Sequence, residues 1–337
     1  MKSAVITENG LEIKDVPQPE AKAGEVLIKV AAAGLNRADL LALQGARGFA
    51  GGGVGGREWS GEVAALGDGV TGLAVGDRVM CTGGGAYAEY AVTVAGRAWK
   101  VPGNNMSLEQ AATLPVSLQT MHNAIVTAGR LEKGDSVLIQ GASSGVGILG
   151  MQIAKTMGAG LVIGTSTHEG RRAKLTEYGA DIALDSKSPD WADKVLEATN
   201  GKGVDLIVDQ VSGGVMNDNL KATRILGRIV NVGRLGGFKG ELDFDLHAAR
   251  RIDYIGVTFR TRSEEEVAEI IRLMKADLWG ALEAGDLSIP IDTAFPLEEA
   301  VEACAEKLRV GLAFVFSNRV SVFCPPARHV VGNEGPV

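Results

Sequence analysis

The sequence predicts an α/β protein that combines a domain built on a parallel sheet with a β-rich domain. Three observations carry this prediction. An apolar strand at residues 137–139 runs into a turn of small residues and then into a helix. Strands and helices alternate after that helix, whereas the residues before the strand form short, glycine-punctuated strands.

The turn at residues 141–147 is suited to a diphosphate. Apolar residues recur at helical spacing after it, so the turn opens a helix, whose first N–H groups are unpaired and whose start carries a partial positive charge. We expect Ser144, Gly145, Val146 and Gly147 to hold the phosphates. Aligned on Gly147, Ala142 and Ser144 replace the first two glycines of G-x-G-x-x-G. An ordinary strand-to-helix turn without a ligand is the alternative.

The downstream order of elements favours the ligand. Strands are predicted at 161–165, 203–209 and 227–233, with a helix at 171–178, which is the alternation of a doubly wound parallel sheet. A last strand follows at 251–259, and Ser263 with Glu266 forms a capping box that opens a long helix. A strand at 289–294, a helix at 297–308 and a strand at 311–316 are expected to return to the β-rich domain.

The first hundred residues predict a barrel-like β domain. Short strands are expected within 26–30, 61–65, 77–80 and 87–92, and one helix at 37–43. The segment 45–56, GARGFAGGGVGG, is expected to be a surface loop, either a flap over the site or a connection without a role. Ser107 and Gln110 form a capping box, and a second helix at 117–128 leads into the parallel-sheet domain.

Composition narrows the class of protein. The chain has 337 residues, 45% of them hydrophobic and 22% charged, so a folded globular protein is expected. A net charge of −7 argues against nucleic acid or an anionic membrane as the main partner. No signal peptide or membrane-length apolar run is present, so a cytoplasmic location is expected. Cys81, Cys304 and Cys324 form no C-x-x-C pair, and we expect reduced thiols.

Several phrases resemble one family in order along the chain. It is similar to the zinc-free quinone oxidoreductases of the medium-chain dehydrogenase/reductase superfamily, near ζ-crystallin. The phrases are AAAGLNRADLLALQG (31–45), SGEVAALGDGVTGLAVGDRVM (60–80), GAYAEYAV (85–92), GDSVLIQGASSGVG (134–147), YGAD (178–181), GVDLIVD (203–209) and GRIVNVG (227–233). The resemblance implies a GroES-like catalytic domain at 1–122 and 263–317 and a Rossmann NADPH-binding domain at 123–262. Residues 318–337 match nothing in the family, and we assign this tail no chemistry.

The resemblance also bears on metal binding. Where zinc-containing members carry ligands, this chain has Asn36, Arg57 before Glu58, and Val116, and these are not zinc ligands. No metal is therefore expected. His122 could serve as a substitute ligand, but a packed or surface histidine is the preferred interpretation.

Zinc-containing members also carry a lobe with four cysteines, which would follow Met80 in this chain. Only Cys81 stands there, so this position also argues against zinc. Without a Lewis acid, alcohol oxidation is not expected. A quinone or an activated C=C bond accepts hydride without a strong electrophile, because the nicotinamide supplies the chemistry and the protein supplies position.

The end of the second parallel strand predicts NADPH rather than NADH. An acidic residue that would bind ribose hydroxyls is missing, and the strand ends Gly164, Thr165, Ser166. Ser166 and Arg171 are expected to bind the 2′-phosphate, with Arg172 as a substitute. The alternative is that these arginines are solvated charges at a helix start.

The resemblance implies contacts at the nicotinamide end. Asn36 and Thr120 match positions that contact the nicotinamide riboside, although Asn36 could instead only cap the next helix. Gly233 is expected to let the backbone approach the nicotinamide. Arg47 and Phe49 lie in a shortened loop where the family has a Tyr-Pro phrase, so they are candidates for contact with substrate.

The family has a second tyrosine, which contacts the adenine side of the cofactor, and this chain has Ser186 at that position. No residue is assigned as the proton donor. The expected function is transfer of reducing equivalents from NADPH to a quinone or similar electron-poor acceptor, in a homodimer formed through residues 254–259. Two alternatives are an NADPH-dependent 2-enal or enone reductase and an NADPH-binding protein without catalysis.

Overall fold

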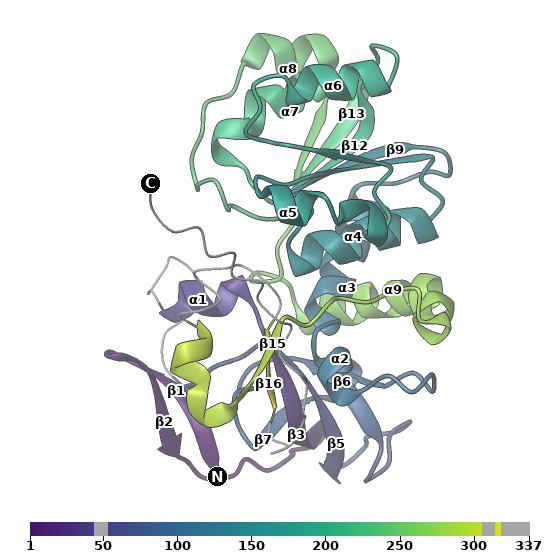
Figure 1. Cartoon of the computed structure of the whole chain (residues 1–337). Helices are drawn as coiled ribbons and strands as arrows, with labels where there is room; N and C mark the ends of the chain where they lie inside the picture. Colours follow the sequence, from purple (N-terminus) through teal and green to yellow (C-terminus); the bar gives the residue numbers. More distant parts are fainter. Residues whose placement is uncertain (44–52, 305–313, 318–337) are drawn as a thin grey trace, which may run out of the picture.

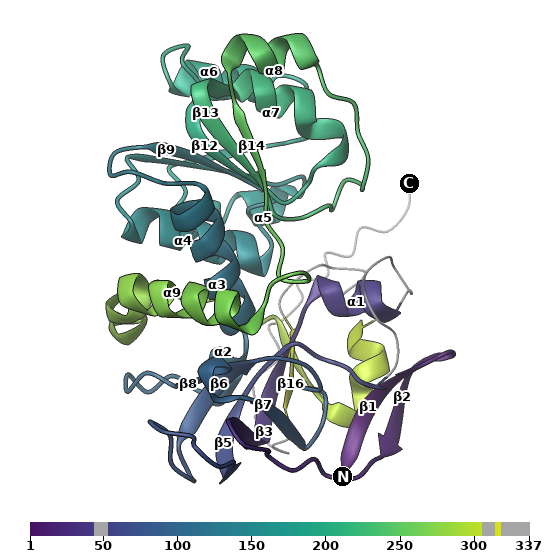
Figure 2. The ribbon, with the colours of Figure 1, turned by 180° about the vertical axis from the view of Figure 1, so that it is seen from behind.

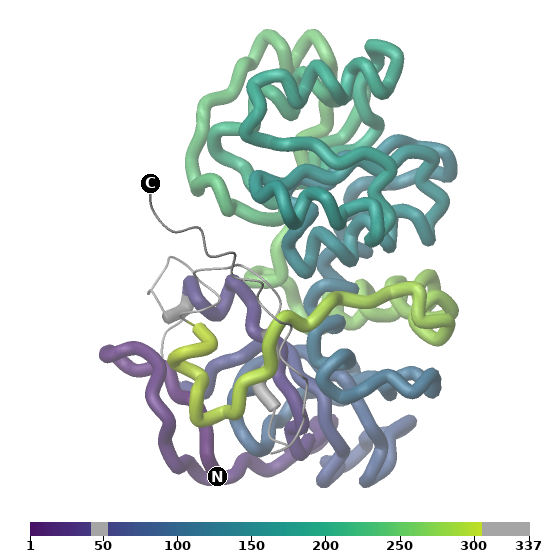
Figure 3. Tube along the Cα trace, viewed as in Figure 1, coloured from purple at the N-terminus to yellow at the C-terminus, as the bar shows by residue number. Residues whose placement is uncertain are grey.

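Two lobes stack on each other in the computed structural model, which describes residues 1–43, 53–304 and 314–317 (Figure 1). The upper lobe in this view contains the parallel sheet, and the lower lobe is rich in antiparallel strands. The chain builds most of the lower lobe first, crosses to the upper one and then returns, as the tube in Figure 3 shows. This path confirms that the last third of the chain rejoins the β-rich lobe.

The parallel-sheet lobe has six strands in the order β11-β10-β9-β12-β13-β14, and every neighbouring pair is parallel. The strands are β9 (Ser136–Gln140), β10 (Leu161–Thr165), β11 (Ile182–Leu184), β12 (Val204–Asp209), β13 (Thr223–Asn231) and β14 (Asp253–Gly256). The helices are α4 (Gly145–Thr156), α5 (Glu169–Arg172), α6 (Trp191–Ala198), α7 (Met216–Ala222) and α8 (Phe244–Arg250). The predicted doubly wound Rossmann-type sheet is confirmed.

Side chains of β9 alternate between two apolar cores. Val137 and Ile139 belong to the core that includes Leu149 of α4, whereas Leu138 packs in the core that includes Trp191 of α6. All three strand residues are fully buried. The continuous apolar run is therefore explained by helices on both faces of the sheet.

The β-rich lobe is organised around the long strand β3 (Glu25–Leu35). One edge of β3 pairs with β5 (Glu58–Leu66), and the other pairs with β7 (Tyr90–Val94) along its first half and with β16 (Phe314–Ser317) along its second half. The sheet order is β15-β16-β3-β5-β6-β8, with β6 (Arg78–Thr82), β8 (Ala98–Lys100) and β15 (Thr293–Pro296). A separate sheet, β2-β1-β4, contains β1 (Lys2–Thr7), β2 (Gly10–Asp15) and β4 (Gly53–Val54).

Helices connect the lobes. They are α2 (Leu108–Ala112), α3 (Pro115–His122), a π-helical turn at Asn123–Ala128, and α9 (Glu264–Ala284), while α1 (Arg37–Leu43) lies on the β-rich lobe. Both predicted capping boxes are present, at Ser107 and Ser263. α9 lies between α4 and α2 in Figures 1 and 2, and its residues share a core with both lobes. The proposed boundaries at 122/123 and 262/263 stay a prediction.

Several element boundaries differ from the sequence prediction. The helix predicted at 117–128 starts at Pro115, because proline fits the first turn of a helix, and it turns π-helical at Asn123. The helix predicted at 171–178 is split into α5 and a 3₁₀ turn at Leu175–Tyr178. The last strands are shorter or shifted, at Asp253–Gly256 and Thr293–Pro296. The hairpin β1–β2 was not predicted, because half-exposed residues blur its alternation.

Candidate functional site

The candidate site lies at the carboxyl ends of β9 and β12, where the order of strands reverses. β9 is followed by β10 on one side of the sheet, and β12 is followed by β13 on the other side. In open α/β sheets the crevice outside such a switch point is where ligands bind. The residues predicted to bind the cofactor in the parallel-sheet lobe all follow β9, β10 or β13.

The predicted phosphate turn adopts the required strand–turn–helix form. Gly141 has a φ of +71°, which begins the tight turn, and Ser144 is the N-cap of α4, with its Oγ accepting from the Gly147 N–H at 3.0 Å. Gly145 and Val146 form the first turn of α4 and are half-buried. The start of a twelve-residue helix thus faces the switch point.

Gly147 has a reason inside the protein for lacking a Cβ. A Cβ there would lie 2.6 Å from the Gly141 carbonyl oxygen and 2.7 Å from the Ala142 Cα. Gly147 therefore permits close packing of α4 on the turn. Packing is thus sufficient to explain the glycine, and contact of Gly147 with a diphosphate stays a prediction.

A buried polar network supports the turn, and it was not predicted. Thr165 Oγ1 donates to Gln140 Oε1 at 2.6 Å, and Gln140 Nε2 donates to Asn219 Oδ1 at 2.9 Å. Asn219 Nδ2 donates to Asp209 Oδ2 at 3.1 Å, and Ser144 Oγ lies 3.1 Å from Gln210 Oε1. The sequence does contain a signal for this network, because a polar residue stands at the end of each of these apolar strands.

Asp209 is the charged member of this network. Burial raises the pKa of Asp209, while N–H groups of Ser212 and Val211 and the charge of Arg234 oppose that shift. Its Oδ1 accepts from the Val211 N–H at 2.8 Å and from the Ser212 N–H at 2.9 Å. The carboxylate thereby holds the first residues of the loop after β12 at the crevice.

The residues expected at the 2′-phosphate lie together after β10. Ser166 is 3% exposed, and its Oγ lies 2.9 Å from Ser143 Oγ in the phosphate turn. Arg172 donates to the Ser166 carbonyl at 3.2 Å and pairs with Asp185 at 2.9 Å, so this proposed substitute is engaged. Arg171 makes no ion pair with any residue that the structure describes.

The loops after β12 and β13 interlock beside the switch point. A Cβ on Gly233 would lie 2.5 Å from the Gln210 carbonyl oxygen, so this glycine is needed for packing between the loops. Ser212 Oγ donates to the Gly233 carbonyl at 2.8 Å, and Asn231 Nδ2 donates to Ser212 Oγ. Ser212 has φ 56° and ψ −153°, a region that is almost restricted to glycine.

In the β-rich lobe, Asn36 contacts Glu58 rather than only capping a helix. Asn36 Nδ2 donates to Glu58 Oε1 at 2.7 Å, and the Val116 N–H donates to Glu58 Oε2 at 2.8 Å. Asn36 and Val116 are two of the positions at which the resemblance places zinc ligands in other members, and the third, Arg57, directly precedes Glu58. Thr120 lies on α3 and is half-buried, and its side chain makes no hydrogen bond with a described residue.

Arg57, the residue before Glu58, belongs to a second polar group together with the buried residues Asp39 and Tyr87. Tyr87 Oη donates to Asp39 Oδ2 at 2.7 Å, and Arg57 Nε lies 3.4 Å from Asp39 Oδ1. Burial, with a further contribution from the Asp39 charge, raises the pKa of Tyr87 well above its usual value. Tyr87 is therefore a neutral hydrogen-bond donor at physiological pH.

The described ranges contain no group of three or more His, Cys, Asp or Glu side chains that could hold a metal ion. His122 is buried, and its Nε2 lies 2.7 Å from Asp277 Oδ2 on α9, which supports the packed interpretation. Cys81 and Cys304 are free and buried. Burial raises the pKa of both thiols, for Cys304 to about 12, so neither is a thiolate at neutral pH.

Some predicted residues lie outside the described part of the chain. These are Arg47 and Phe49 in the loop, Cys324, and the tail at 318–337. Among the described residues, no helix has both the length and the apolar character required to span a membrane.

Comparisons with known proteins agree with this geometry. A family model described as zinc-binding dehydrogenase matches residues 145–276, and one described as alcohol dehydrogenase GroES-like domain matches residues 22–103. The quinone oxidoreductase of Rattus norvegicus is 30% identical over 293 residues, which cover 86% of this chain and 87% of the rat protein.

Solved structures give the same result. A mycobacterial protein solved in complex with NADPH is 27% identical, with a TM-score of 0.84, and the match covers 94% of this chain and 100% of that one. An NAD-dependent alcohol dehydrogenase is 30% identical, with a TM-score of 0.81 and coverage of 94% and 99%. The similarity therefore extends over both lobes.

Proposed function

Because the chain belongs to the quinone oxidoreductase family of the medium-chain dehydrogenase/reductase superfamily, we propose that it transfers reducing equivalents from NADPH to a quinone or similar electron-poor acceptor without a metal ion. The family assignment rests on similarity over most of the chain. The choice of cofactor and the absence of metal rest on the residues of the site.

The choice of NADPH rests on the end of β10. Ser166 follows this strand where an acidic residue would bind ribose hydroxyls in an NAD enzyme. Arg171, five positions later on α5, makes no ion pair with a described residue. A hydroxyl and an unengaged guanidinium suit a phosphate. The relative solved with NADPH supports this choice, whereas the NAD-dependent relative makes the comparison of both cofactors necessary.

The proposed reaction assigns roles to residues of this chain. The bound nicotinamide supplies hydride. Ser144 and the first N–H groups of α4 bind the diphosphate, Ser166 and Arg171 bind the 2′-phosphate, and Asn36 and Thr120 orient the nicotinamide end. The residues at the positions of zinc ligands, Asn36, Arg57 and Val116, do not fit a zinc ion, and water supplies the proton to the reduced acceptor.

Steady-state assays test the proposal. The purified protein is supplied with NADPH or NADH and with 1,2-naphthoquinone or a 2-enal, and metal content is measured in the same active sample. We expect NADPH oxidation with the quinone, a clear preference for NADPH, and less than stoichiometric zinc.

The other outcomes favour the alternatives. Turnover with the 2-enal alone favours the enone reductase, and NADPH binding with neither acceptor reduced favours a binding protein. Failure to bind NADPH, or stoichiometric zinc in active enzyme, contradicts the proposal.

A further inference from the structure

Glu58 is a buried carboxylate between the two segments that are proposed to meet the nicotinamide end. It is the first residue of β5 and is 3% exposed. Its Oε1 accepts from Asn36 Nδ2 at 2.7 Å, and its Oε2 accepts from the Val116 N–H at 2.8 Å. Each oxygen of the carboxylate therefore faces a donor, one on the segment before α1 and one in the first turn of α3.

The position of this carboxylate is restricted by its neighbours. A Cβ on Gly34 of β3 would lie 2.6 Å from Glu58 Oε1 and 2.6 Å from the Ala112 carbonyl oxygen. Glycine at this point of β3 thus leaves the space that Glu58 occupies. Because the Val116 N–H belongs to the backbone, it fixes one oxygen of Glu58, while the other oxygen accepts from Asn36.

The fixed carboxylate determines the orientation of the Asn36 amide. A carboxylate only accepts hydrogen bonds, so the NH₂ end of the amide must face Glu58. Asn36 Oδ1 then faces away; no described residue donates to it, and it is not among the buried side-chain atoms that lack a partner. The amide therefore presents an accessible acceptor.

We propose that Glu58 is a positioning residue that holds the Asn36 amide so that Oδ1 accepts a hydrogen bond from a hydroxyl or N–H donor of the nicotinamide half of NADPH. This inference rests on the proposed function, because it assumes that Asn36 lies at that half of the cofactor. It assigns the carboxylate a role in cofactor geometry, acting through Asn36.

Reversing the polarity of the Asn36–Glu58 pair tests the proposal. In Glu58→Gln, the backbone N–H of Val116 still requires an acceptor, so the new amide turns its NH₂ toward position 36. The Asn36 amide must then turn over and present a donor. In the double variant Glu58→Gln/Asn36→Asp, the new aspartate accepts from the glutamine and presents an acceptor again. The double variant keeps the net charge of the natural chain.

Calorimetry with two ligands separates positioning from damage to the fold. NADPH contains both halves of the cofactor, whereas adenosine 2′,5′-bisphosphate contains only the adenine half and is the matched control. We expect E58Q to bind NADPH roughly tenfold more weakly, the loss of about one hydrogen bond. We expect E58Q/N36D to regain most of that loss, with adenosine 2′,5′-bisphosphate bound equally by all three proteins.

A second variant covers the case in which E58Q does not fold. Asn36→Ala removes the presented acceptor directly and should weaken NADPH by a similar factor without changing binding of adenosine 2′,5′-bisphosphate. Equal weakening of both ligands, unchanged NADPH binding, or no recovery in E58Q/N36D overturns the proposal. If the natural protein itself does not bind NADPH, the proposed function fails, which is a distinguishable result.

Discussion

At the scale of single residues, two neighbouring arginines at the end of α5 differ in what they contact. Arg172 pairs with Asp185 and donates to the Ser166 carbonyl, so it stabilises the turn after β10. Arg171 has no ion pair with a described residue. The sequence predicts Arg171 for the 2′-phosphate with Arg172 as a substitute, and these contacts favour Arg171.

Arg171→Ala should therefore change cofactor choice. We expect NADPH to bind roughly 10- to 100-fold more weakly, the loss of a charge-assisted pair, and NADH to bind as before. Arg172→Ala is the matched control and should lower thermal stability instead. Calorimetric titration of both variants with both cofactors checks this, and equal weakening of NADPH and NADH by R171A would count against it.

Ser212 shows backbone strain at the crevice. Its φ of 56° and ψ of −153° are unfavourable for any residue with a Cβ, yet hydrogen bonds to Asp209, Asn231 and Gly233 hold it there. Gly213, which follows it, also has a positive φ and packs against the Gly236 carbonyl.

Because the backbone of Ser212 is strained, we expect the glycine variant to be more stable than the alanine variant there, the reverse of the usual order. Ser212→Gly should be more stable than Ser212→Ala by about 1–3 kcal/mol, because glycine adopts this conformation freely and both variants lack the hydroxyl. At Ser186, whose φ is not positive, alanine should instead exceed glycine by roughly 0.5–1 kcal/mol. Urea unfolding of the four variants measures both differences, and the same order at both positions would refute the idea of strain.

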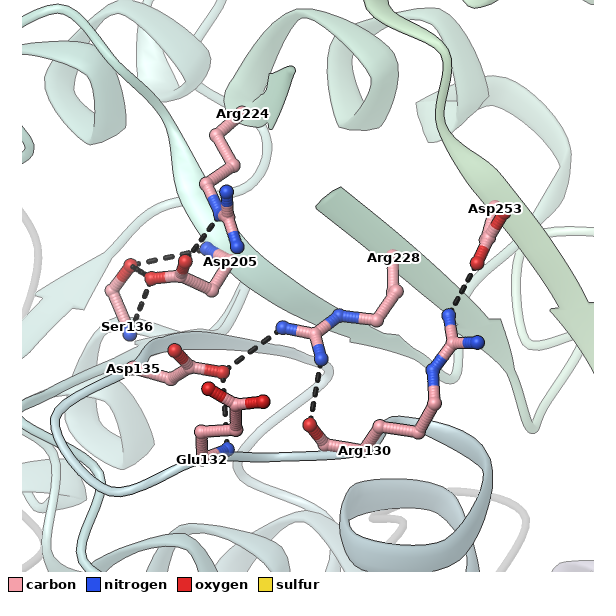
Figure 4. A network of polar contacts seen from close by, with 8 residues as sticks. All are labelled: Arg130, Glu132, Asp135, Ser136, Asp205, Arg224, Arg228 and Asp253. Carbon is pink, nitrogen blue, oxygen red and sulfur yellow. Dashed lines mark hydrogen bonds and ion pairs between the residues drawn. The ribbon is translucent and has the colours of Figure 1, made fainter. Parts of the chain in front are cut away.

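At the scale of elements, charged and polar side chains connect the amino-terminal ends of neighbouring strands of the parallel sheet (Figure 4). Asp205 of β12 accepts from the Ser136 N–H at 2.8 Å and the Ser136 Oγ at 2.7 Å, and it pairs with Arg224. Arg228 of β13 donates to Asp135 at 2.9 Å and to the Arg130 carbonyl at 2.6 Å. This edge is opposite the candidate site, so its polar contacts serve stability.

The Asp205 contacts predict a pH dependence. Burial favours the neutral acid, but hydrogen bonds from Ser136 and the Arg224 charge outweigh it and lower the pKa of Asp205 below 3.8. The stabilisation is therefore complete above that value and is lost as the pH falls through the lower pKa of the folded state. We expect Asp205→Asn to lower the free energy of unfolding by about 1–3 kcal/mol at neutral pH.

The difference between the natural protein and D205N should shrink as the pH falls below 3.8, since only the natural protein carries this titration. Chemical unfolding at successive pH values measures it. A difference that stays constant or grows in acid would show that the charge of Asp205 is not the cause.

At the scale of the whole molecule, β14 is an outer strand of the parallel sheet (Figure 2). Its register pairs it with β13 on one side, and Tyr254 is 47% exposed. We therefore propose a homodimer in which the sheets of two copies continue through β14. This agrees with the interface expected at residues 254–259.

A charge on this strand should dissociate the dimer. We expect the natural protein to elute at twice the chain mass and Tyr254→Glu to elute as a monomer, because equal charges would meet across the two-fold axis. Val75→Glu, on an exposed side chain of the other lobe, is the control and should stay dimeric. Light scattering after size exclusion measures the mass, and a monomeric natural protein would exclude the interface.

The sequence by itself determined most of the elements and the order of the two lobes. The capping boxes at Ser107 and Ser263, the strand–turn–helix at the phosphate turn and the alternation of buried strands depend on residues close in the chain. Local hydrogen bonds and side-chain periodicity are enough to specify such features. The matching phrases extended this prediction to the family.

Only the tertiary structure decided which polar side chains meet. Asn36 and Glu58 are separated by 22 positions and Glu58 and Val116 by 58, and no local pattern indicates that one carboxylate joins them. Gly147 and Gly233 are required by backbone packing, which a motif does not distinguish from contact with a ligand. The physical reason is that these contacts depend on how strands and helices pack, and packing joins residues distant in sequence.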